Sequence, residues 1–285
     1  GGDAAATQRL RESFDAAENL PKEALRQVAL SQPQVGSALT GRATQCKLGG
    51  VFTDPVQPCG ATVAPGTITC WSVDLDQPDE RVAGLARVLA ADERERATRF
   101  IFARDRRRFV VARACLRMLL GRVCDLPAGA IRFAYGPHGK PSLVSQGSPP
   151  PVHFSVSHSD DLAVIAMAPD APLGVDVELV RPLPDLLHVA TRYFTPAEAS
   201  TIAEAPAHHR ELTFYLCWIR KEAFAKALGD GLRRKLDRCR VTCRPGEPAR
   251  ILDIDGSTTA AAGWAVYDLE PGPGFVGAAV MVVAY

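Results

Sequence analysis

The sequence predicts an α+β fold of two pseudo-symmetric α+β lobes with a ligand cleft between them, plus an N-terminal extension. A strand, a helix and a strand pair follow one another twice, which indicates two related units of roughly 100 residues each. A similar short stretch occurs in each half, "TRF" at 98–100 and "TRYF" at 191–194. We therefore expect an extension over 1–67, a first lobe over 68–172 and a second lobe over 173–285. A cleft between such lobes is a natural ligand site.

The composition is that of a globular protein and limits the classes of partner. The chain is 47% hydrophobic and 23% charged, with a net charge of +1, so a polyanion site must come from local clustering of basic residues. No signal peptide or apolar run of membrane length is visible. The eight cysteines form no C-x-x-C pair, which favours reduced thiols. We expect a cytoplasmic monomer with no nucleic-acid or membrane partner.

The extension, residues 1–67, differs from the rest of the chain. Its first part, "TQRLRESFDAAENLPKEALRQVALSQ", can form one or two short helices. The remainder is rich in Gly, Pro, Thr and Ala and lacks helical or strand periodicity. We interpret it as a loosely structured segment, and its pattern indicates no function.

The first lobe begins with a strand at about 67–75 and continues with two helices. The longer helix follows Asp105, a candidate N-cap, and Gly121 is a candidate C-terminal stop. The apolar stripe expected on it is Phe109, Ala112, Leu116 and Leu119. A loop, "YGPHGKPSL", and two short strands, "HFSVSH" and "LAVIAMA", complete this lobe.

The second lobe opens with the strand "LGVDVEL", followed by a long helix over 208–228 and two closing strands, "GWAVYDLE" and "GFVGAAVMVVAY". Because side chains alternate along a strand, Asp176 and Glu178 share one face. Two carboxylates at this spacing repel each other unless a cation lies between them, and Mg²⁺ prefers such oxygen ligands. A solvated edge strand shows the same pattern, and Asp74 and Asp76 form a similar pair in the first half.

The long helix contains "LCWIRKEAFAKALG", in which Lys221 falls on an apolar stripe. Trp218, Glu222 and Lys226 line up beside it, four residues apart. An exposed Glu222–Lys226 pair would contribute only about 0.3–0.5 kcal/mol. A lysine on an apolar stripe, in contrast, either extends to the surface or meets a buried anion.

Two further patterns suit the binding of phosphate. In "HFSVSHSDD", Ser157 and His158 point to opposite faces of a strand, so they cannot easily form a nucleophile–base pair, and no G-x-S-x-G elbow is present. Arginines also run from Arg94 to Arg117, and Lys140 follows in "HGKP". They are either a solvated helix face or a site for a polyphosphate or acidic partner. Arginines that share one helix face are Arg106, Arg113 and Arg117.

In the order "HGKP", "FSVSHS", "GVDVE", "WIRKEAFAK", these motifs resemble those of the 4′-phosphopantetheinyl transferases, in their single-chain, two-lobed form that serves peptide and polyketide synthases. The resemblance covers roughly 68–285. It implies coenzyme A bound between the lobes and Mg²⁺ as the metal. It further implies transfer of phosphopantetheine to a serine of an acyl or peptidyl carrier protein, an acidic helical domain, with release of 3′,5′-adenosine diphosphate.

The resemblance also implies roles for single residues. Asp176, Glu178 and Glu222 match the Mg²⁺-binding acids, and Lys226 matches a lysine near the transferred phosphoryl group. Glu222 is in addition a candidate base for the serine proton. The residues implied to bind coenzyme A are Arg96, Arg108, Lys140, Ser157, His158 and Lys221. One departure is Glu93, which stands where the family often has lysine.

Two other functions stay open at this point. A non-catalytic coenzyme A or nucleotide-binding module would keep the fold, but the presence of all three acids and both lysines counts against it. A metal-dependent phosphohydrolase is a further alternative, and the sequence shows no second metal-ligand cluster for it. Phosphopantetheine gained by an apo carrier protein would decide for the transferase.

Overall fold

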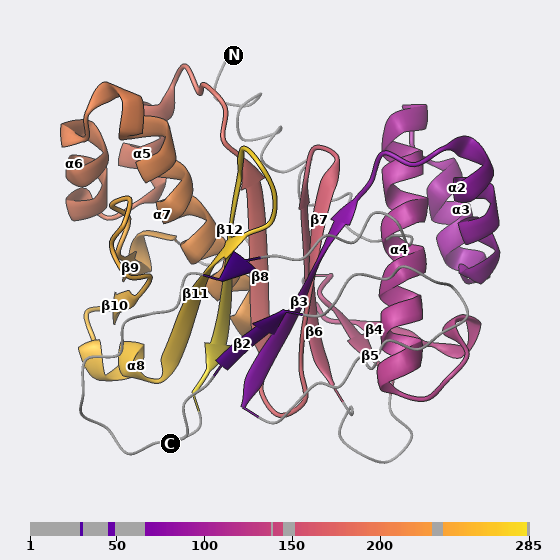
Figure 1. Cartoon of the computed structure of the whole chain (residues 1–285). Helices are drawn as coiled ribbons and strands as arrows, with labels where there is room; N and C mark the ends of the chain where they lie inside the picture. The colour runs from indigo at the N-terminus through magenta and orange to yellow at the C-terminus, as the bar shows by residue number, and fades with distance from the viewer. Residues whose placement is uncertain are drawn as a thin grey trace.

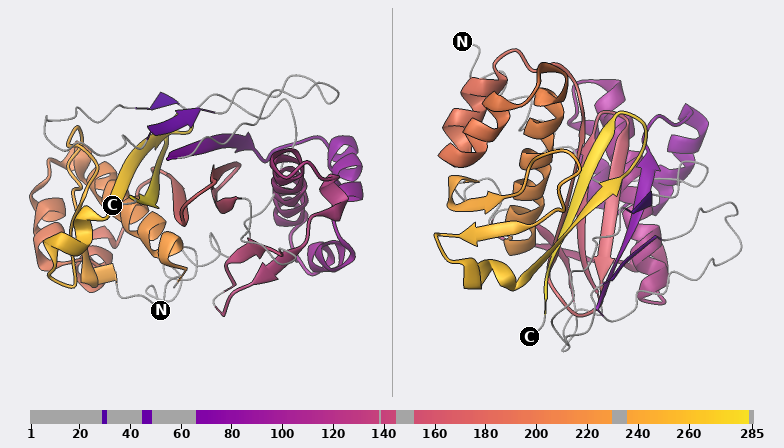
Figure 2. Two further views of the ribbon diagram at one scale, coloured as in Figure 1. Left: turned by 90° about the horizontal axis from the view of Figure 1, so that it is seen from below. Right: turned by 60° about the vertical axis from the view of Figure 1, so that its left-hand side comes forward.

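The computed structural model describes residues 29–30, 45–48, 66–137, 139–144, 152–229 and 236–283. They form two α+β lobes whose sheets lie next to each other in the middle of the molecule, with the helices outside (Figure 1). Seen from below, the helices of the two lobes lie on opposite sides of the sheets (Figure 2). This confirms the predicted two-lobed α+β fold. In the described part of the chain no helix is long and apolar enough to cross a membrane.

The first lobe is a sheet of order β2-β3-β7-β6 covered by helices. Its sheet strands are β2 (Gln45–Leu48), β3 (Thr67–Asp74), β6 (His153–Ser159) and β7 (Leu162–Ala168). The helices are α2 (Asp79–Leu85), η2 (Ala86–Val88), α3 (Ala91–Thr98), α4 (Ala103–Val123) and η3 (Ala128–Ala130). A separate antiparallel hairpin consists of β4 (Phe133–Tyr135) and β5 (Pro141–Leu143). The predicted stripe of α4 is buried in the core of this lobe.

The ends of α4 differ from the prediction. Phe102 is the N-cap residue, so Asp105 lies inside the first turn, where its charge still favours the helix N-terminus. Gly121 does not stop the helix, which continues to Val123. A Cβ at Gly121 would lie 2.6 Å from the carbonyl oxygen of Leu126, so glycine is required by the returning chain.

The second lobe is a sheet of order β1-β11-β12-β8 with α7 packed on β8 and β12. Its sheet strands are β1 (Ala29–Leu30), β8 (Leu173–Leu179), β11 (Trp264–Glu270) and β12 (Phe275–Val282). The helices are α5 (Leu186–Tyr193), α6 (Pro196–Glu204), α7 (Ala207–Leu228), η5 (Leu236–Arg238) and α8 (Thr258–Ala262). A small antiparallel pair consists of β9 (Cys239–Val241) and β10 (Ile251–Ile254).

The two lobes meet where β6 lies beside β8. The amide N–H groups of Val175 and Leu179 on β8 donate to the hydroxyls of Ser155 and Ser159 on β6, at 3.1 and 3.2 Å. A cluster of buried apolar residues also draws members from both sheets, including Val164 on β7. The sheets are therefore joined by side-chain hydrogen bonds and by a shared apolar core.

The N-terminal segment contributes a short strand to each sheet. β1 pairs antiparallel with β11, and β2 pairs parallel with β3. Ala29–Leu30 lie in the stretch predicted to form short helices, so that prediction is wrong at these two residues. β2 lies in the part that showed no strand periodicity, because four residues are too few to display one. The predicted short helices before residue 29 lie outside the described residues.

We expect a variant that starts at Thr67 to fold and to transfer phosphopantetheine at a rate within about threefold of the full chain. Among the described residues, the truncation removes two short edge strands, β1 and β2, so the melting temperature should fall slightly. Circular dichroism melting and carrier loading measure both effects. An insoluble or inactive variant would show that the lobes need this segment.

Candidate active site

The predicted acids and lysine meet because α7 lies directly on β8. A Cβ at Gly174 would be 2.0 Å from the carbonyl oxygen of Ala223 and 2.4 Å from the amide nitrogen of Ala227. Such distances exclude any side chain, so the glycine of "GVDVE" is required for the close approach of helix and strand. The face of β8 that carries Asp176 and Glu178 therefore lies beneath the helix that carries Glu222 and Lys226.

Asp176, Ser157 and Lys226 form a closed triangle of hydrogen bonds. Lys226 Nζ lies 2.8 Å from Asp176 Oδ1 and 2.8 Å from Ser157 Oγ. The Ser157 hydroxyl donates to the same Asp176 oxygen at 2.7 Å. Asp176 is only 3% exposed, so this charge-assisted contact is shielded from water. The structure thus brings together a predicted metal ligand on β8, a predicted catalytic lysine on α7 and a serine on β6 that was predicted to bind coenzyme A.

Glu178 is buried next to Asp176 and accepts a hydrogen bond from Ser159 Oγ at 2.7 Å. Burial, and after it the Asp176 carboxylate, raise the pKa of Glu178 to about 8. The Ser159 hydrogen bond and the Lys226 charge act in the opposite direction. The ligand-free site therefore disfavours the charged form of this carboxyl group.

Glu222 is fully buried, and neither of its carboxylate oxygens has a hydrogen-bond partner among the described residues. The second oxygen of Asp176 is also unpaired there. Burial, followed by the charges of Asp176 and Glu178, raises the pKa of Glu222 well above its usual range. Buried anionic oxygens of this kind fit a hard cation. Nevertheless, no group of three His, Cys, Asp or Glu side chains in the described ranges has a metal-binding arrangement as it stands.

Two lysines predicted to bind coenzyme A make hydrogen bonds to other groups of the protein. Lys221 Nζ lies 2.8 Å from Glu198 Oε2 and 2.8 Å from the carbonyl oxygen of Leu236, and it also donates to the carbonyl of Cys239. These contacts use all three donors of a side chain that is 1% exposed. Lys221 thereby anchors α6 and β9 to α7. Lys140, in the first lobe, donates to three backbone carbonyls of the second lobe, and these are its hydrogen bonds among the described residues.

Arg108 and His158 lie near the same end of β6. Arg108 Nε donates to Asp161 at 2.8 Å and its Nη2 pairs with Asp160, in the turn directly after β6. His158 is a buried residue of that strand. Arg96, the looser candidate, is exposed on α3 and lies 5.3 Å from the centre of the Phe109 ring.

The arginine face of α4 is in part a buried ion-pair cluster. Arg117 makes two hydrogen bonds to the Glu93 carboxylate, at 2.6 and 3.0 Å, and Arg113 Nε lies 3.3 Å from it. All three side chains are buried, with Arg113 stacked 4.6 Å from the Phe133 ring. The interpretation of Arg113 and Arg117 as a surface for polyphosphate is therefore wrong. Glu93, where the resemblance implies lysine, pairs with both arginines.

The acidic pair of the first lobe has no comparable environment. Asp74 and Asp76 are exposed at the end of β3. Asp74 Oδ1 accepts a hydrogen bond from the amide of Asp76 at 3.0 Å, which is a turn contact.

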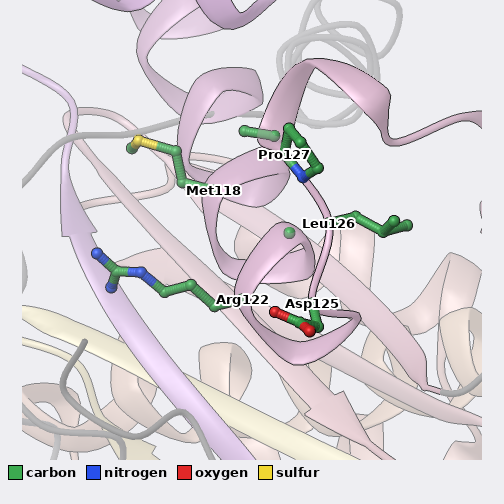
Figure 3. Close-up of a pocket in the computed structure, with 7 residues that line it drawn as sticks. Met118, Arg122, Asp125, Leu126 and Pro127 are labelled. Atoms are coloured by element: carbon green, nitrogen blue, oxygen red, sulfur yellow. The ribbon is translucent and has the colours of Figure 1, made fainter.

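A pocket of about 430 Å³ lies at the C-terminal end of α4 (Figure 3). Its lining residues are Met118, Gly121, Arg122, Asp125, Leu126, Pro127 and Ala128. None of the predicted site residues belongs to this lining, so we do not assign it to the active site.

Sequence reasoning included Gly174 and Ser159 in its motifs but gave neither residue a role of its own in the site. A signal for Ser159 exists, because Ser155, Ser157 and Ser159 alternate along β6 and so share one face. Gly174 shows no such signal: a glycine before a strand acid carries no pattern until the helix packed on it is known.

The site is a cluster of three buried carboxylates beside a lysine in a two-lobed α+β fold. Residues 77–170 match the family model "4′-phosphopantetheinyl transferase, N-terminal", and residues 172–273 match "4′-phosphopantetheinyl transferase superfamily". The chain therefore belongs to the 4′-phosphopantetheinyl transferase family, whose members use coenzyme A, and is an enzyme of that type.

Its curated relatives carry the same description. The chain is 34% identical over 229 residues to 4′-phosphopantetheinyl transferase HetI of Nostoc sp.. The aligned residues make up 80% of this chain and 93% of the relative. A 4′-phosphopantetheinyl transferase of Bacillus subtilis is 30% identical, over 59% of this chain and 72% of the relative. The L-aminoadipate-semialdehyde dehydrogenase-phosphopantetheinyl transferase of Homo sapiens is 32% identical, over 56% of this chain and 54% of the relative.

Proposed function

We propose that this enzyme transfers 4′-phosphopantetheine from coenzyme A to a serine of an acyl or peptidyl carrier protein, with Mg²⁺, and releases 3′,5′-adenosine diphosphate. The observation that carries this proposal is the buried set of Asp176, Glu178 and Glu222 with Lys226 between β8 and α7. A cluster of three acids beside one lysine destabilises an empty site, and it suits a cation and a pyrophosphate together.

The reaction forms a bond from the carrier serine oxygen to the β-phosphorus of coenzyme A and breaks the bond from that phosphorus to the bridging oxygen. When bound, Mg²⁺ would neutralise charge on the pyrophosphate, held by Asp176, Glu178 and Glu222. Glu222, directly or through a metal-bound water, is the proposed acceptor of the serine proton. Lys226, fixed by Asp176 and Ser157, donates to oxygens of the transferred phosphoryl group.

Coenzyme A is held, in this proposal, by residues of the first lobe near β6. Ser157 and His158 serve its phosphates, and Arg108 serves the nucleotide end, with Arg96 as the more distant candidate. Arg108 pairs with Asp160 and Asp161 in the turn that follows His158 on β6, so the proposal requires it to exchange these partners for coenzyme A.

Alanine in place of Arg108 or His158 should raise the KM for coenzyme A more than it lowers kcat. Loss of one charge-assisted contact to a phosphate corresponds to roughly ten- to a hundredfold in KM. Arg107→Ala is the matched control on the same helix, because Arg107 pairs with the exposed Asp79. Steady-state kinetics and calorimetry measure the effect, and normal coenzyme A affinity in both variants would refute the assignment.

The proposed reaction is tested by mass spectrometry of apo carrier proteins after incubation with the enzyme, coenzyme A and Mg²⁺. We expect the mass of one phosphopantetheine to be gained, and the gain to disappear with a chelator. Coenzyme A binding without transfer across a panel of carriers would favour a binding module instead. Hydrolysis of coenzyme A without a carrier would favour a phosphohydrolase.

The cellular setting is part of the same proposal. Six of the cysteines are free thiols in the structure, which supports a reducing cytoplasm; they are Cys70, Cys115, Cys124, Cys217, Cys239 and Cys243. We further propose that the enzyme acts as a monomer, which light scattering of the purified protein would test.

A further inference from the structure

Lys140 connects the first lobe to both elements that carry the site in the second lobe. Its Nζ donates to the carbonyl oxygen of Leu173 at 3.2 Å, and Leu173 is the first residue of β8. It also donates to the carbonyl oxygens of Lys226 and Ala227, the latter at 3.4 Å, in the last turn of α7. One ammonium group thus lies where β8 begins and α7 ends.

A cation is favourable at the C-terminal end of α7. The last four carbonyls of a helix have no intrahelical N–H partner, and the partial negative charge at this end favours a cation. Gly229, in the left-handed conformation, donates its amide to the carbonyls of Ala225 and Lys226. Lys140 supplies further donors, and its Cδ lies 3.8 Å from the position of a Cβ at Gly229.

The same contacts leave Lys140 little capacity for a phosphate. An ammonium has three N–H donors, and the three carbonyl contacts use them. Burial, and after it the charge of Lys226, lower the pKa of Lys140 to about 8. The charged form of this lysine is therefore less stable here than in water. The three backbone contacts that Lys140 makes to the second lobe offset this loss, and they indicate that the residue joins the two lobes.

We propose that Lys140 is a positioning residue that fastens the last turn of α7 to the start of β8 and thereby holds Lys226 against Asp176 and Ser157. The geometry supports this because Lys226 supplies both a carbonyl to Lys140 and an ammonium to the site, 2.8 Å from Asp176. Gly174, adjacent to Leu173, leaves no clearance between β8 and α7, so a shift of the last turn must move Lys226. The inference rests on the proposed role of Lys226 in the transfer.

The test compares Lys140→Met with Arg132→Met. Arg132 is the matched control, because it also donates to backbone carbonyls, those of Gly129 and Ile131, but within the first lobe. In Lys140→Met, we expect kcat to fall by roughly ten- to a hundredfold, with the dissociation constant for coenzyme A changed by less than about threefold. Amide hydrogen exchange over 225–229 should accelerate in this variant and stay unchanged in the control.

Each outcome bears on the proposal. A tenfold or greater loss of coenzyme A affinity with normal exchange over 225–229 would make Lys140 a ligand of coenzyme A and overturn it, as would unchanged kcat and exchange. If Lys140→Met does not fold, Lys140→Arg keeps the charge and several donors, and it should show a smaller acceleration of exchange at the same amides. Exchange is measured on the ligand-free protein, so it tests the positioning even if the wild type transfers nothing.

Discussion

Asp176→Ala should abolish phosphopantetheine transfer, by at least about a hundredfold in kcat, while the protein stays folded. The substitution removes one proposed Mg²⁺ ligand and also the carboxylate that holds Lys226 Nζ at 2.8 Å. Both losses act on charge stabilisation at the reacting phosphoryl group. Carrier loading at saturating Mg²⁺, with circular dichroism of the same sample, measures the two parts of this expectation.

Asp74→Ala is the control for Asp176→Ala, since it removes an aspartate from a similar Asp-x-acid pair in the first lobe. Asp74 is exposed and makes a turn contact with the amide of Asp76, so transfer should change little. An active Asp176→Ala, or a folded but inactive Asp74→Ala, would mean that the metal binds in the other lobe.

Glu222→Gln should also abolish transfer, and it should change how stability depends on pH. The folded-state pKa of Glu178 is raised to about 8 and that of Glu222 well above its usual 4.5. Without ligands, the folded protein therefore binds more protons than the unfolded chain in a window that begins at about pH 4.5 and, for Glu178, ends at about pH 8. Stability is therefore full below this window and is lost as the pH rises through the raised pKa values. Glutamine is neutral at every pH, so this variant lacks one of the two titrating groups and should lose less stability as the pH rises.

Thermal melting at pH 6 and pH 9 without metal measures this difference. From pH 6 to pH 9, the melting temperature of the wild type should fall further than that of Glu222→Gln. With Mg²⁺ and coenzyme A added, ligand binding should stabilise the wild type more than the variant. Equal pH dependence in both proteins would show that Glu222 is not a source of the strain in the ligand-free site.

Local patterns in the sequence predicted the two-lobed fold and the residues of the acidic cluster. The period of two placed Asp176 and Glu178 on one face of β8, and the period of about 3.6 placed Glu222 and Lys226 on one face of α7. Such periodicities depend on backbone geometry alone, so they can be read without knowledge of distant contacts. The resemblance to a family added that the strand and the helix meet.

The partners of the buried charges came only from the tertiary structure. Lys221 was predicted to bind coenzyme A, but it pairs with Glu198 on α6, and Arg117 pairs with Glu93 on α3. From the sequence, each of these cations is indistinguishable from one that binds phosphate, because the residue type is the same in both cases.

The contact of Lys140 shows the physical reason most clearly. It reaches the carbonyl of Lys226, 86 residues away in the chain, through main-chain atoms that every residue possesses. No residue type marks a carbonyl acceptor, and no period relates residues so far apart. The sequence by itself therefore determined which side chains can carry the chemistry. Only the tertiary contacts decided which cations face the site, as Lys226 does, and which hold the fold, as Lys221 and Arg117 do.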